Sequence, residues 1–384
     1  MTTEAFDAIV IGAGSVGLPT CIALAERGMS VLCLEALASP GQGSHKCAIG
    51  GIRATHSDAS KVSLGLASLE VFRTWRERYG DDIAWRQGGY AYVSYDQHTE
   101  DLLRGMLPGQ RAAGLHIDWI DAQTMAELVP GIEVEYLRGG TYSPQDGSAS
   151  PLKCSAAFAR RARQLGVVFR FQEPVTGFVR EGDTLRTVST NRGRYAGGWF
   201  INAAGMYATE VAAFAGVEVS VRCDCHEAGI TEPVQRFFTP MVVDVRREPD
   251  SASFYFYQNE EGQVIFCITP DPPIWGTDLR ETSQFLPMVA KRMVQLYPRL
   301  ANLKVRRTWR GCYPNSIDGL PYVDRTGATN HVVAVGMSGQ GFMLGPGVGD
   351  LVARMVTGAL TTHDRDVLHP LRVQRRQSVR EALA

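Results

Sequence analysis

Three glycines near the beginning of the sequence have the spacing that binds a dinucleotide. Gly12, Gly14 and Gly17 give G-x-G-x-x-G directly after the apolar run AIVI. The first glycine permits a tight turn, the second lets backbone N–H groups approach a pyrophosphate, and the third lets the following helix pack closely. Glu35 ends the next apolar run, where a carboxylate can accept hydrogen bonds from a ribose diol. The segment 6–36 therefore predicts a strand, a turn, a helix and a second strand that bind an adenine dinucleotide, either NAD or FAD.

A second glycine-rich stretch, GMSGQGFMLGPGVGD, covers residues 336–350 and leads into an apolar, helix-like run. Glycine costs conformational entropy, so this density is expected where the backbone needs unusual φ/ψ angles or where a large flat molecule lies against it. Its position more than 300 residues after the first motif favours FAD, because a nicotinamide dehydrogenase generally completes its nucleotide fold in one contiguous segment. The stretch FINAAGMYA at 200–208 predicts a strand that ends behind the adenosine, and it also favours FAD.

Composition and charge argue against several classes of function. A chain of 384 residues exceeds what one hydrophobic core usually serves, so we expect about two domains. The net charge of −1, with like charges gathered only in the arginine-rich LRVQRRQSVR, gives no sign of nucleic-acid or membrane-surface binding. No apolar stretch reaches the roughly 18 residues of a spanning helix, and the first strand-like run starts at Phe6, which leaves no room for a leader. We therefore expect a cytoplasmic protein.

The eight cysteines are scattered through apolar or mixed sequence, which is typical of buried thiols in a reducing compartment. Cys223, Cys225 and His226 form the one cluster, in RCDCHEAG. Two cysteines one residue apart without a second pair are weak evidence for a metal, and the run alternates as a strand does. We expect no metal site.

The order of strand-like and helix-like runs predicts a discontinuous fold of two domains, α/β combined with α+β. A Rossmann-like FAD-binding domain would gather residues 1–86, 151–216 and 316–384. A substrate domain with a mostly antiparallel sheet would take residues 87–150 and 217–315, where GGYAYVSY, QRFFTPMVVDV and SFYFYQ are predicted strands.

Five segments together resemble the D-amino acid oxidase and sarcosine oxidase superfamily of FAD enzymes. They are the first glycine motif, GQGSHKCAIGGIRATHSDAS at 41–60, FINAAGMYA, RTWRGCYPNSIDGLP at 307–321, and the stretch from 336. The resemblance covers nearly the whole chain and is greatest to the β subunits of hetero-oligomeric sarcosine oxidase and dye-linked L-proline dehydrogenase. It implies a small amino-acid substrate and a hetero-oligomer with other oxidoreductase subunits.

The resemblance implies that the helix beginning near Gly341 points its N-terminus at the flavin, where N–H groups stabilise the negative charge of the reduced ring. The residues expected to bind FAD are Gly12, Gly14, Ser15, Gly17, Glu35, Ala36, Gly43, Ser44, His45, Lys46, Gly51, Val175, Ala204, Gly205, Gly311, Gly336, Gly339, Gln340, Gly341, Phe342 and Met343.

The resemblance also implies how the FAD is held. The cysteine that anchors FAD covalently in the monomeric sarcosine oxidases aligns with Gly311, so we expect non-covalent FAD. Cys312, one position later, would face the other way in extended chain and is expected to be a packed thiol. The histidine that carries covalent FMN in sarcosine oxidase β subunits aligns with Gln145. Any FMN would therefore be non-covalent and would require a partner subunit.

Arg53 aligns with the arginine that binds the substrate carboxylate in the monomeric sarcosine oxidases, and a planar bidentate donor suits a carboxylate. Two other positions differ from the monomeric sarcosine oxidases. Met343 replaces a lysine that is a second carboxylate ligand in those enzymes, so fewer groups would bind the substrate carboxylate. The lysine associated with oxygen activation falls near Val264, and an uncharged residue there favours a dehydrogenase, or an oxidase in which O₂ reacts elsewhere.

Aromatic and polar side chains are expected to complete the substrate pocket. Phe254 and Phe256 alternate with Tyr255 and Tyr257, so one face of this strand packs in a core and the tyrosine face roofs the pocket or is also plain packing. By their place in the motifs, Tyr313 and Gln340 are further candidates, and His226 and His56 are weaker ones.

The resemblance implies oxidation of an amino-acid C–N bond, with a secondary amine such as proline, hydroxyproline or sarcosine as substrate. Arg53 would hold the carboxylate while the carbon-bound hydrogen transfers as hydride to flavin N5. This route needs no strong protein base, in agreement with the lack of an obvious His/Asp or Cys/His constellation. Three alternatives remain open: a lone-subunit oxidase of sarcosine, glycine or a D-amino acid, a non-catalytic FAD-stabilised subunit of a complex, and a nicotinamide dehydrogenase.

Overall fold

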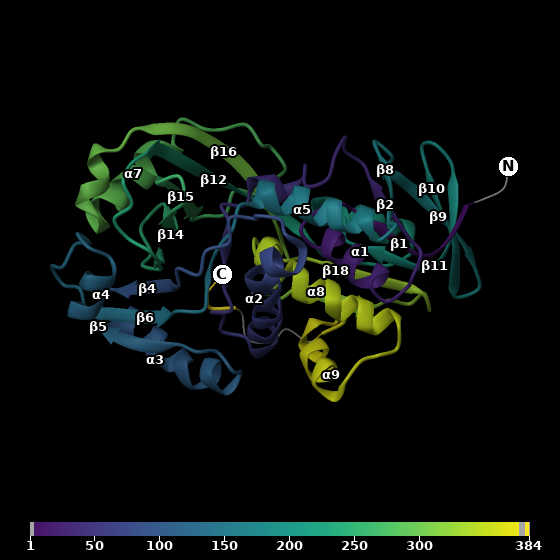
Figure 1. Ribbon diagram of the computed structural model, residues 1–384, viewed down its shortest axis with the longest axis horizontal. Coiled ribbons are helices and arrows are strands. Elements are labelled where there is room, and N and C mark those ends of the chain that lie inside the picture. Colours follow the sequence, from purple (N-terminus) through teal and green to yellow (C-terminus); the bar gives the residue numbers. More distant parts are fainter. Residues whose placement is uncertain (1–3, 376–380, 384) are drawn as a thin grey trace.

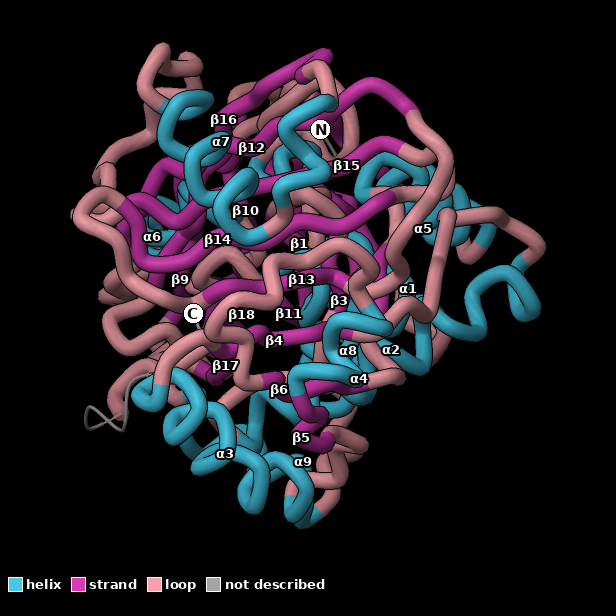
Figure 2. Tube along the Cα trace, turned by 90° about the vertical axis from the view of Figure 1, so that its left-hand side faces the viewer, coloured by secondary structure: helices cyan, strands magenta, loops and turns pink. Residues whose placement is uncertain are grey.

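The computed structural model describes residues 4–375 and 381–383. Its strands form two eight-stranded sheets, and Figure 1 shows these sheets toward opposite ends of the long axis of the molecule. A small third sheet joins β3 (Gly51–Ile52) to β7 (Gly147–Ser148). Figure 2 looks along the long axis and shows the strands at the centre of the view, with helices and loops around them.

The first sheet has a parallel centre with the strand order β17-β18-β11-β1-β2-β8. An antiparallel extension pairs β9 with β10 and β10 with β11. All four residues of the run AIVI in β1 are buried, because both faces of this strand are covered. The strands are β1 (Glu4–Ile11), β2 (Val31–Glu35), β8 (Val168–Phe171), β9 (Val175–Glu181), β10 (Thr184–Thr190), β11 (Arg194–Asn202), β17 (Tyr322–Arg325) and β18 (His331–Val335).

Helices cover one face of this sheet: α1 (Gly17–Ala25), α2 (Ala59–Tyr79), α5 (Pro151–Gln164) and α8 (Gly341–Val356). Three glycines of α8 allow it to lie directly on its neighbours (Figure 1). A Cβ at Gly345 would stand 2.0 Å from the carbonyl oxygen of Ser15, and one at Gly347 would stand 2.4 Å from that of Leu64. Gly349 is equally crowded by the backbone of α1. The later glycines of the 336–350 stretch therefore serve helix packing.

The second sheet has the order β16-β12-β15-β14-β13-β4-β6-β5, and among these pairs the β13–β4 pair is parallel. One face carries Phe254, Phe256 and Phe266, which pack against α7 (Phe285–Leu296). The other face carries Tyr90 and Tyr257 and is turned toward the loop around Ile49. The strands are β4 (Tyr90–Ser94), β5 (Asp118–Asp121), β6 (Gly139–Ser143), β12 (Arg222–Pro233), β13 (Met241–Asp244), β14 (Ser251–Gln258), β15 (Gln263–Pro270) and β16 (Val305–Asn315).

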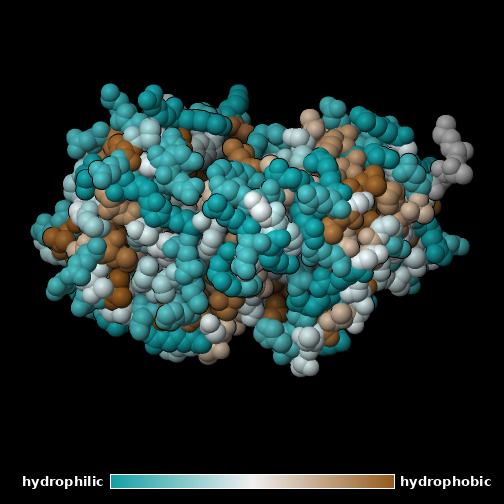
Figure 3. All heavy atoms as spheres, in the orientation of Figure 1, coloured by the Kyte–Doolittle hydropathy of each residue, from teal (hydrophilic) through white to brown (hydrophobic). Residues whose placement is uncertain are grey.

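The remaining helices are α3 (Gln97–Ala112), α4 (Ala122–Leu128), α6 (Ala208–Phe214) and α9 (Thr362–Leu368). Within the described ranges, no helix is long and apolar enough to cross a membrane. Figure 3 shows hydrophilic side chains spread over this face of the molecule, with apolar side chains in small separate groups.

The combination of a mostly parallel sheet and a mostly antiparallel sheet confirms the predicted fold class. The strands of the first sheet fall within the segments assigned above to the FAD-binding domain, and those of the second fall within the segments assigned to the substrate domain. The boundaries of the two domains stay a prediction.

Candidate functional site

A cavity of about 410 Å³ lies where the two sheets meet. Its walls include residues that follow the carboxyl ends of β1, β2, β11 and β18, where open α/β sheets place their ligand sites. Residues of β4, β13, β14 and β16 line it from the second sheet. The volume lies in the range of about 300–1,000 Å³ typical of ligand pockets.

The G-x-G-x-x-G turn lines this cavity at the start of α1. Gly12 has φ +106°, and a Cβ there would stand 2.6 Å from the carbonyl oxygen of Ala203. Gly14 has no neighbour within 4 Å of its missing Cβ and lines the cavity, so its backbone is open to a ligand. Gly17 does not line the cavity, because its missing Cβ would meet the carbonyl oxygen of Gly12 at 1.8 Å. Its expected role as a cofactor-binding residue is therefore corrected to close packing of α1.

Glu35 stands at the end of β2 with its carboxylate fixed by backbone donors. The N–H of Ala13 donates to Oε2 at 2.7 Å, and that of Leu37 donates to Oε1 at 2.8 Å. A carboxylate offers about four lone-pair sites, so each oxygen can accept a further hydrogen bond. Glu35 lines the cavity with these oxygens in a position that suits a ribose diol.

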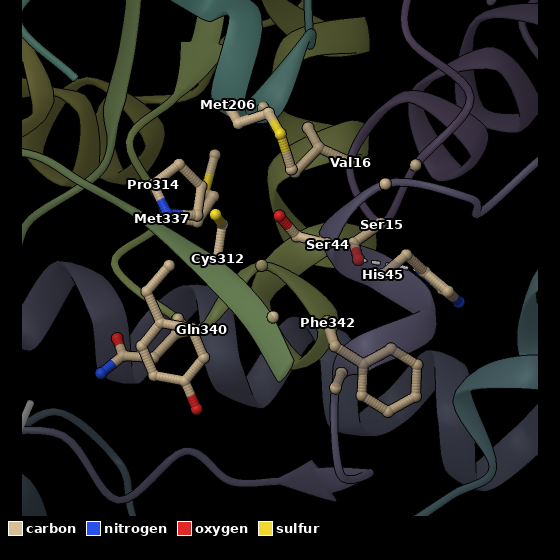
Figure 4. A pocket seen from close by; sticks show the side chains of 18 of the residues that line it. Ser15, Val16, Ser44, His45, Met206, Cys312, Pro314, Met337, Gln340 and Phe342 are labelled. Atoms are coloured by element: carbon tan, nitrogen blue, oxygen red, sulfur yellow. Dashed lines mark hydrogen bonds between the residues drawn. The ribbon is translucent and has the colours of Figure 1, made fainter. Parts of the chain in front are cut away.

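A short helical turn (Ser44–Cys47) lies beside the first turn of α1 and is held by His45. Its Nδ1 is 2.9 Å from Ser15 Oγ, shown as a dashed line in Figure 4, and its Nε2 is 2.7 Å from the carbonyl oxygen of Pro151. A carbonyl can only accept, so Nε2 carries the proton and Nδ1 accepts from Ser15. Burial lowers the pKa of His45 and keeps the ring neutral. This histidine therefore fixes the Gly43–Ser44 loop against α1.

The stretch beginning at Gly336 passes along the cavity to the first turn of α8. Gly336 and Gly339 have φ of +70° and +77°, and Ser338 between them has φ +50°. A Cβ at Gly339 would stand 2.4 Å from the ring of Tyr313. The first turn of α8 carries N–H groups that its own helix cannot bind, and it lines the cavity at Gly341. Such a positive helix end suits an electron-rich ring or an anion.

Taken together, these residues fit an adenine dinucleotide. The turn at Gly12 and Gly14 offers backbone donors for phosphates, Glu35 offers acceptors for a ribose, and α8 directs a second helix N-terminus into the same cavity. Of the expected cofactor residues, those that line the cavity are Gly12, Gly14, Ser15, Glu35, Ala36, Gly43, Ser44, His45, Gly51, Val175, Ala204, Gly205, Gly311, Gly336, Gly339, Gln340, Gly341, Phe342 and Met343.

Arg53 lies in the cavity wall beside the second sheet, with 7% of its surface exposed. Nη1 donates to the carbonyl oxygen of Thr55 and lies 3.0 Å from His56 Nδ1, and Nη2 donates to the carbonyl oxygen of Leu383 at 2.6 Å. Burial opposes the charged form of Arg53, but Tyr92 and other acidic groups nearby give a net rise of its pKa. The cavity therefore contains a permanent buried cation.

Two ionisable groups beside Arg53, His56 and Asp146, have shifted pKa values. Burial, followed by the charge of Arg53, holds the pKa of His56 well below its usual value, so His56 is neutral. Asp146 accepts hydrogen bonds from Ala54 N at 2.8 Å and from Thr55 Oγ1 at 2.6 Å. Burial raises the pKa of Asp146 to about 6 in spite of these donors. Asp146 thus holds the backbone that follows Arg53.

The tyrosine pair Tyr255 and Tyr313 forms another part of the cavity wall. Their hydroxyl oxygens are 2.6 Å apart, and burial raises the pKa of both well above the usual value. The ring of His226 stacks on Tyr313 with centroids 3.9 Å apart, and its Nε2 lies 3.0 Å from Asp224 Oδ2. His226 thus supports the pair from behind without lining the cavity.

Gln340 lines the cavity just before α8 and is labelled in Figure 4. Its Oε1 is buried and has no hydrogen-bond partner within the residues that the structure describes. This oxygen is therefore shielded from the open cavity by the surrounding protein, and other atoms of Gln340 line the cavity.

Two other expected residues lie away from the cavity. The hydroxyl of Tyr257 donates to the carbonyl oxygen of Ile49 at 2.5 Å, so this tyrosine holds the loop that precedes Arg53. Lys46 is exposed, and its Nζ donates to Gln42 Oε1 at 3.4 Å. The expectation of pocket contacts for Tyr257 and Lys46 is therefore corrected.

Val264 also requires a correction. It is fully buried in the phenylalanine core beneath α7, on the face of the second sheet that is turned away from the cavity. The expected connection between this position and oxygen activation therefore has no support in the geometry.

Several cavity residues were not found by sequence reasoning. Cys312 was expected to be a packed thiol, and it is buried, with Sγ 3.7 Å from Cys225 Sγ, but it also lines the cavity together with Met206 (Figure 4). Tyr90 and Tyr92 alternate in YAYVS, a pattern that could have identified one face of β4 as a wall. Leu383 follows no motif, because long-range folding alone brings it to the site. Across the described ranges, no three side chains of the metal-ligating types form a group that could hold an ion.

Comparisons with known proteins agree with this geometry. The family model DAO, described as FAD dependent oxidoreductase, matches residues 7–355. The β subunit of sarcosine oxidase from an Arthrobacter species is 25% identical, with 92% of this chain and 87% of that protein covered. Glycine oxidase from Geobacillus kaustophilus is 26% identical over 94% and 96% of the two chains. The crystal structure of L-proline dehydrogenase from P. horikoshii superposes with a TM-score of 0.89 and 29% identity, covering 96% of this chain and 98% of that one.

Proposed function

Because the chain belongs to the DAO family of FAD-dependent oxidoreductases, we propose that it oxidises the C–N bond of a small amino acid. The preferred substrate in this proposal is a secondary amine such as proline, hydroxyproline or sarcosine. The observation that carries the proposal is the buried guanidinium of Arg53 in the wall of the cavity that fits the dinucleotide. The predicted family and FAD dependence are confirmed, and the nicotinamide alternative is thereby excluded.

Arg53 has the donors that a substrate carboxylate requires. A guanidinium carries five N–H groups. Three contacts of Arg53 go to internal acceptors, on Thr55, His56 and Leu383, which leaves two donors for a ligand. Two N–H groups are what a bidentate carboxylate uses, and a charged pair of this kind is strong when water is excluded.

The rest of the pocket is suited to an uncharged amine. The hydroxyls of Tyr255 and Tyr313 keep their protons at neutral pH because burial raises both pKa values. His56 beside Arg53 is neutral as well. A neutral amine can accept a hydrogen bond from the tyrosine hydroxyl whose proton is not used within the pair, whereas an ammonium group can only donate. This arrangement orients the substrate without a strong protein base.

When bound, FAD supplies the acceptor for the two electrons and the hydrogen removed from the substrate carbon. In this proposal Gly12, Gly14 and Ser15 hold its phosphates, Glu35 holds its ribose, and the first turn of α8 lies beside its ring. Gly311 has no side chain with which to form a covalent link, so the FAD is proposed to be non-covalent. The open backbone at Gly14 supports this placement.

The partner and the electron acceptor belong to the same proposal. The Arthrobacter relative is named as a subunit, which supports assembly of this chain with other oxidoreductase subunits that receive the electrons. An FMN would be present in this proposal only where a partner subunit shares its site.

An anaerobic titration of the purified yellow protein tests the proposal. The visible spectrum is recorded while L-proline, hydroxyprolines, sarcosine, glycine and D-amino acids are added one at a time. Bleaching of the flavin by a secondary amino acid is the expected result, and the return of colour in air identifies an oxidase. A flavin that no amino acid bleaches contradicts catalysis by this chain alone and favours the non-catalytic alternative.

A further inference from the structure

The segment Glu381–Leu383 lies far from Arg53 in sequence, yet it reaches the substrate side of the cavity. Glu381 fixes it there through a buried ion pair, with Lys61 Nζ 3.0 Å from Glu381 Oε2 and both side chains 0% exposed. The backbone N–H and the hydroxyl of Ser57 donate to Glu381 Oε1 at 2.9 Å and 2.6 Å. Burial alone would raise the pKa of Glu381, but the charge of Lys61 and the hydrogen bonds from Ser57 hold it below its usual range. The segment is therefore an integral part of the interior.

Leu383 is placed by three contacts of different kinds. Its N–H donates to Glu381 Oε1 at 3.1 Å, and its carbonyl oxygen accepts from Arg53 Nη2 at 2.6 Å. Its side chain is 3% exposed, belongs to the same apolar cluster as Tyr92 and Val243, and lines the cavity. The side chain is thus held at the wall next to the guanidinium.

The position of Leu383 has a direct consequence for substrate choice. A carboxylate that binds the two remaining donors of Arg53 has its Cα within a few bonds of the guanidinium, so the groups on Cα and on the amine extend along the nearby wall. Val243, Val245, Tyr92 and Leu383 make that wall apolar. Leu383 contacts Arg53 through its backbone carbonyl. A substitution of its side chain therefore changes the volume of the pocket and leaves this hydrogen-bond acceptor in place.

We propose that Leu383 is a specificity-determining residue: its side chain forms the end wall of the substrate pocket and limits the size of the amino acid that Arg53 can hold. This inference rests on the proposed function, because it takes a carboxylate at Arg53 as its starting point. The wall would exclude amino acids with a larger ring than that of proline or with a longer N-alkyl group than that of sarcosine.

The test compares Leu383→Ala, Leu383→Phe and Leu103→Ala in the FAD-loaded enzyme. Leu103 is a matched control, because it lies in the same apolar cluster, is 1% exposed and does not line the cavity. The measured quantity is the ratio of kcat/KM for pipecolate and proline, or for N-ethylglycine and sarcosine. One methylene in an apolar pocket changes such ratios about 10- to 200-fold. We expect Leu383→Ala to raise the ratio at least tenfold, Leu383→Phe to lower it, and Leu103→Ala to leave it within twofold.

A binding measurement keeps this inference separate from the proposed function. Kd values for saturated carboxylic acids of increasing size are obtained from the change that each acid causes in the absorption of the bound flavin. The proposed wall predicts that Leu383→Ala tightens binding of the larger acids more than that of acetate. If amino acids reduce the flavin but both Leu383 variants keep the wild-type ratios of kcat/KM, the inference about Leu383 is overturned. The proposed function then still stands. If neither reduction nor carboxylate binding occurs in the wild type, the proposed function fails, and the inference fails with it.

Discussion

The hydroxyl groups of Tyr255 and Tyr313 meet at 2.6 Å, although β12 and β15 separate their strands in the second sheet. The two side chains therefore reach toward each other across two intervening strands and close this part of the cavity wall. The stacked ring of His226 fixes one partner, and Gly339 leaves room for the same ring. Such a pair holds the wall in one shape and leaves one hydroxyl proton, which is not used within the pair, for a neighbouring group.

Removal of either hydroxyl is expected to leave the other without its protein partner in the wall of the cavity. Tyr255→Phe and Tyr313→Phe should each lower the free energy of unfolding by ~0.5–1.5 kcal/mol, the net contribution of one hydrogen bond. The double variant should lose less than the sum, because it removes both partners at once. Denaturant unfolding of the four proteins in this double-mutant cycle measures the coupling, and strictly additive losses would contradict the pairing.

Arg53→Ala is expected to retain FAD and to lose substrate affinity by roughly 100-fold or more, because truncating one partner of a buried charge pair costs about 2–5 kcal/mol. The bound flavin is measured by its visible spectrum, and the affinity by anaerobic flavin reduction. Arg53→Lys is the matched control, because it keeps the positive charge and loses the bidentate geometry. Its substrate affinity should fall between that of the wild type and that of Arg53→Ala. Equal affinity of Arg53→Ala and the wild type would show that the carboxylate binds elsewhere.

Gly12→Ala is expected to abolish FAD loading. Its φ of +106° strains any L residue, and the new Cβ would stand 2.6 Å from the backbone of Ala203, so the turn must move. Gly28→Ala is a matched control, because Gly28 also has a positive φ, of +81°, but has no neighbour within 4 Å of its missing Cβ. The ratio of flavin to protein after purification provides the readout. Equal FAD content in the two variants would contradict the assignment of the turn.

Glu381→Gln is expected to lower the free energy of unfolding at pH 7 by up to ~3–5 kcal/mol, because it removes the partner of the buried Lys61, whose pKa burial already lowers to about 8. Urea unfolding measures this loss. A second substitution, Lys61→Met, in the same chain should restore much of it, since both charges are then absent. An unchanged stability of the single variant would show that the ion pair is exposed to water in solution.

The same carboxylate predicts a pH dependence. The folded-state pKa of Glu381 lies below its unfolded value of 4.5, so the stability it contributes is present above pH 4.5 and is lost as pH falls through the folded pKa. The difference in stability between the wild type and Glu381→Gln should shrink below pH 4.5, by at most ~1.4 kcal/mol per pH unit for one proton. A difference that stays constant with pH in this range would contradict the charged state of Glu381.

Local sequence patterns predicted a large part of this molecule. The glycine turn and Glu35 lie within one strand-turn-helix-strand unit, so short-range geometry alone defines them, and the two faces of β14 followed from simple alternation. The family, the fold class and FAD were predicted from motif order. Alternation could not distinguish Tyr255 from Tyr257, because both side chains point to the same face of the sheet. The hydroxyl of Tyr257 donates to the carbonyl oxygen of Ile49, and this contact keeps Tyr257 out of the cavity.

Residues brought in by long-range contacts escaped prediction. Leu383 carries no motif, and its place depends on the distant pairing of Lys61 with Glu381. The lysine associated with oxygen activation was placed near Val264 from the resemblance, but a shift of one residue in a strand reverses the face, and Val264 itself lies in the opposite core. The later glycines of the 336–350 stretch resemble cofactor contacts in sequence, whereas their neighbours are helix backbones.

The contact between Gly345 of α8 and the backbone of Ser15 at the start of α1 sets the spacing of two helix N-termini. On the proposed assignment, one of these ends holds the phosphates of the cofactor and the other lies beside its ring. Backbone packing, rather than a side chain, therefore fixes the distance between the proposed phosphate site and the proposed ring site. FMN also carries a ring and a phosphate, so on this assignment it would lack only the adenosine part, whose ribose Glu35 would bind.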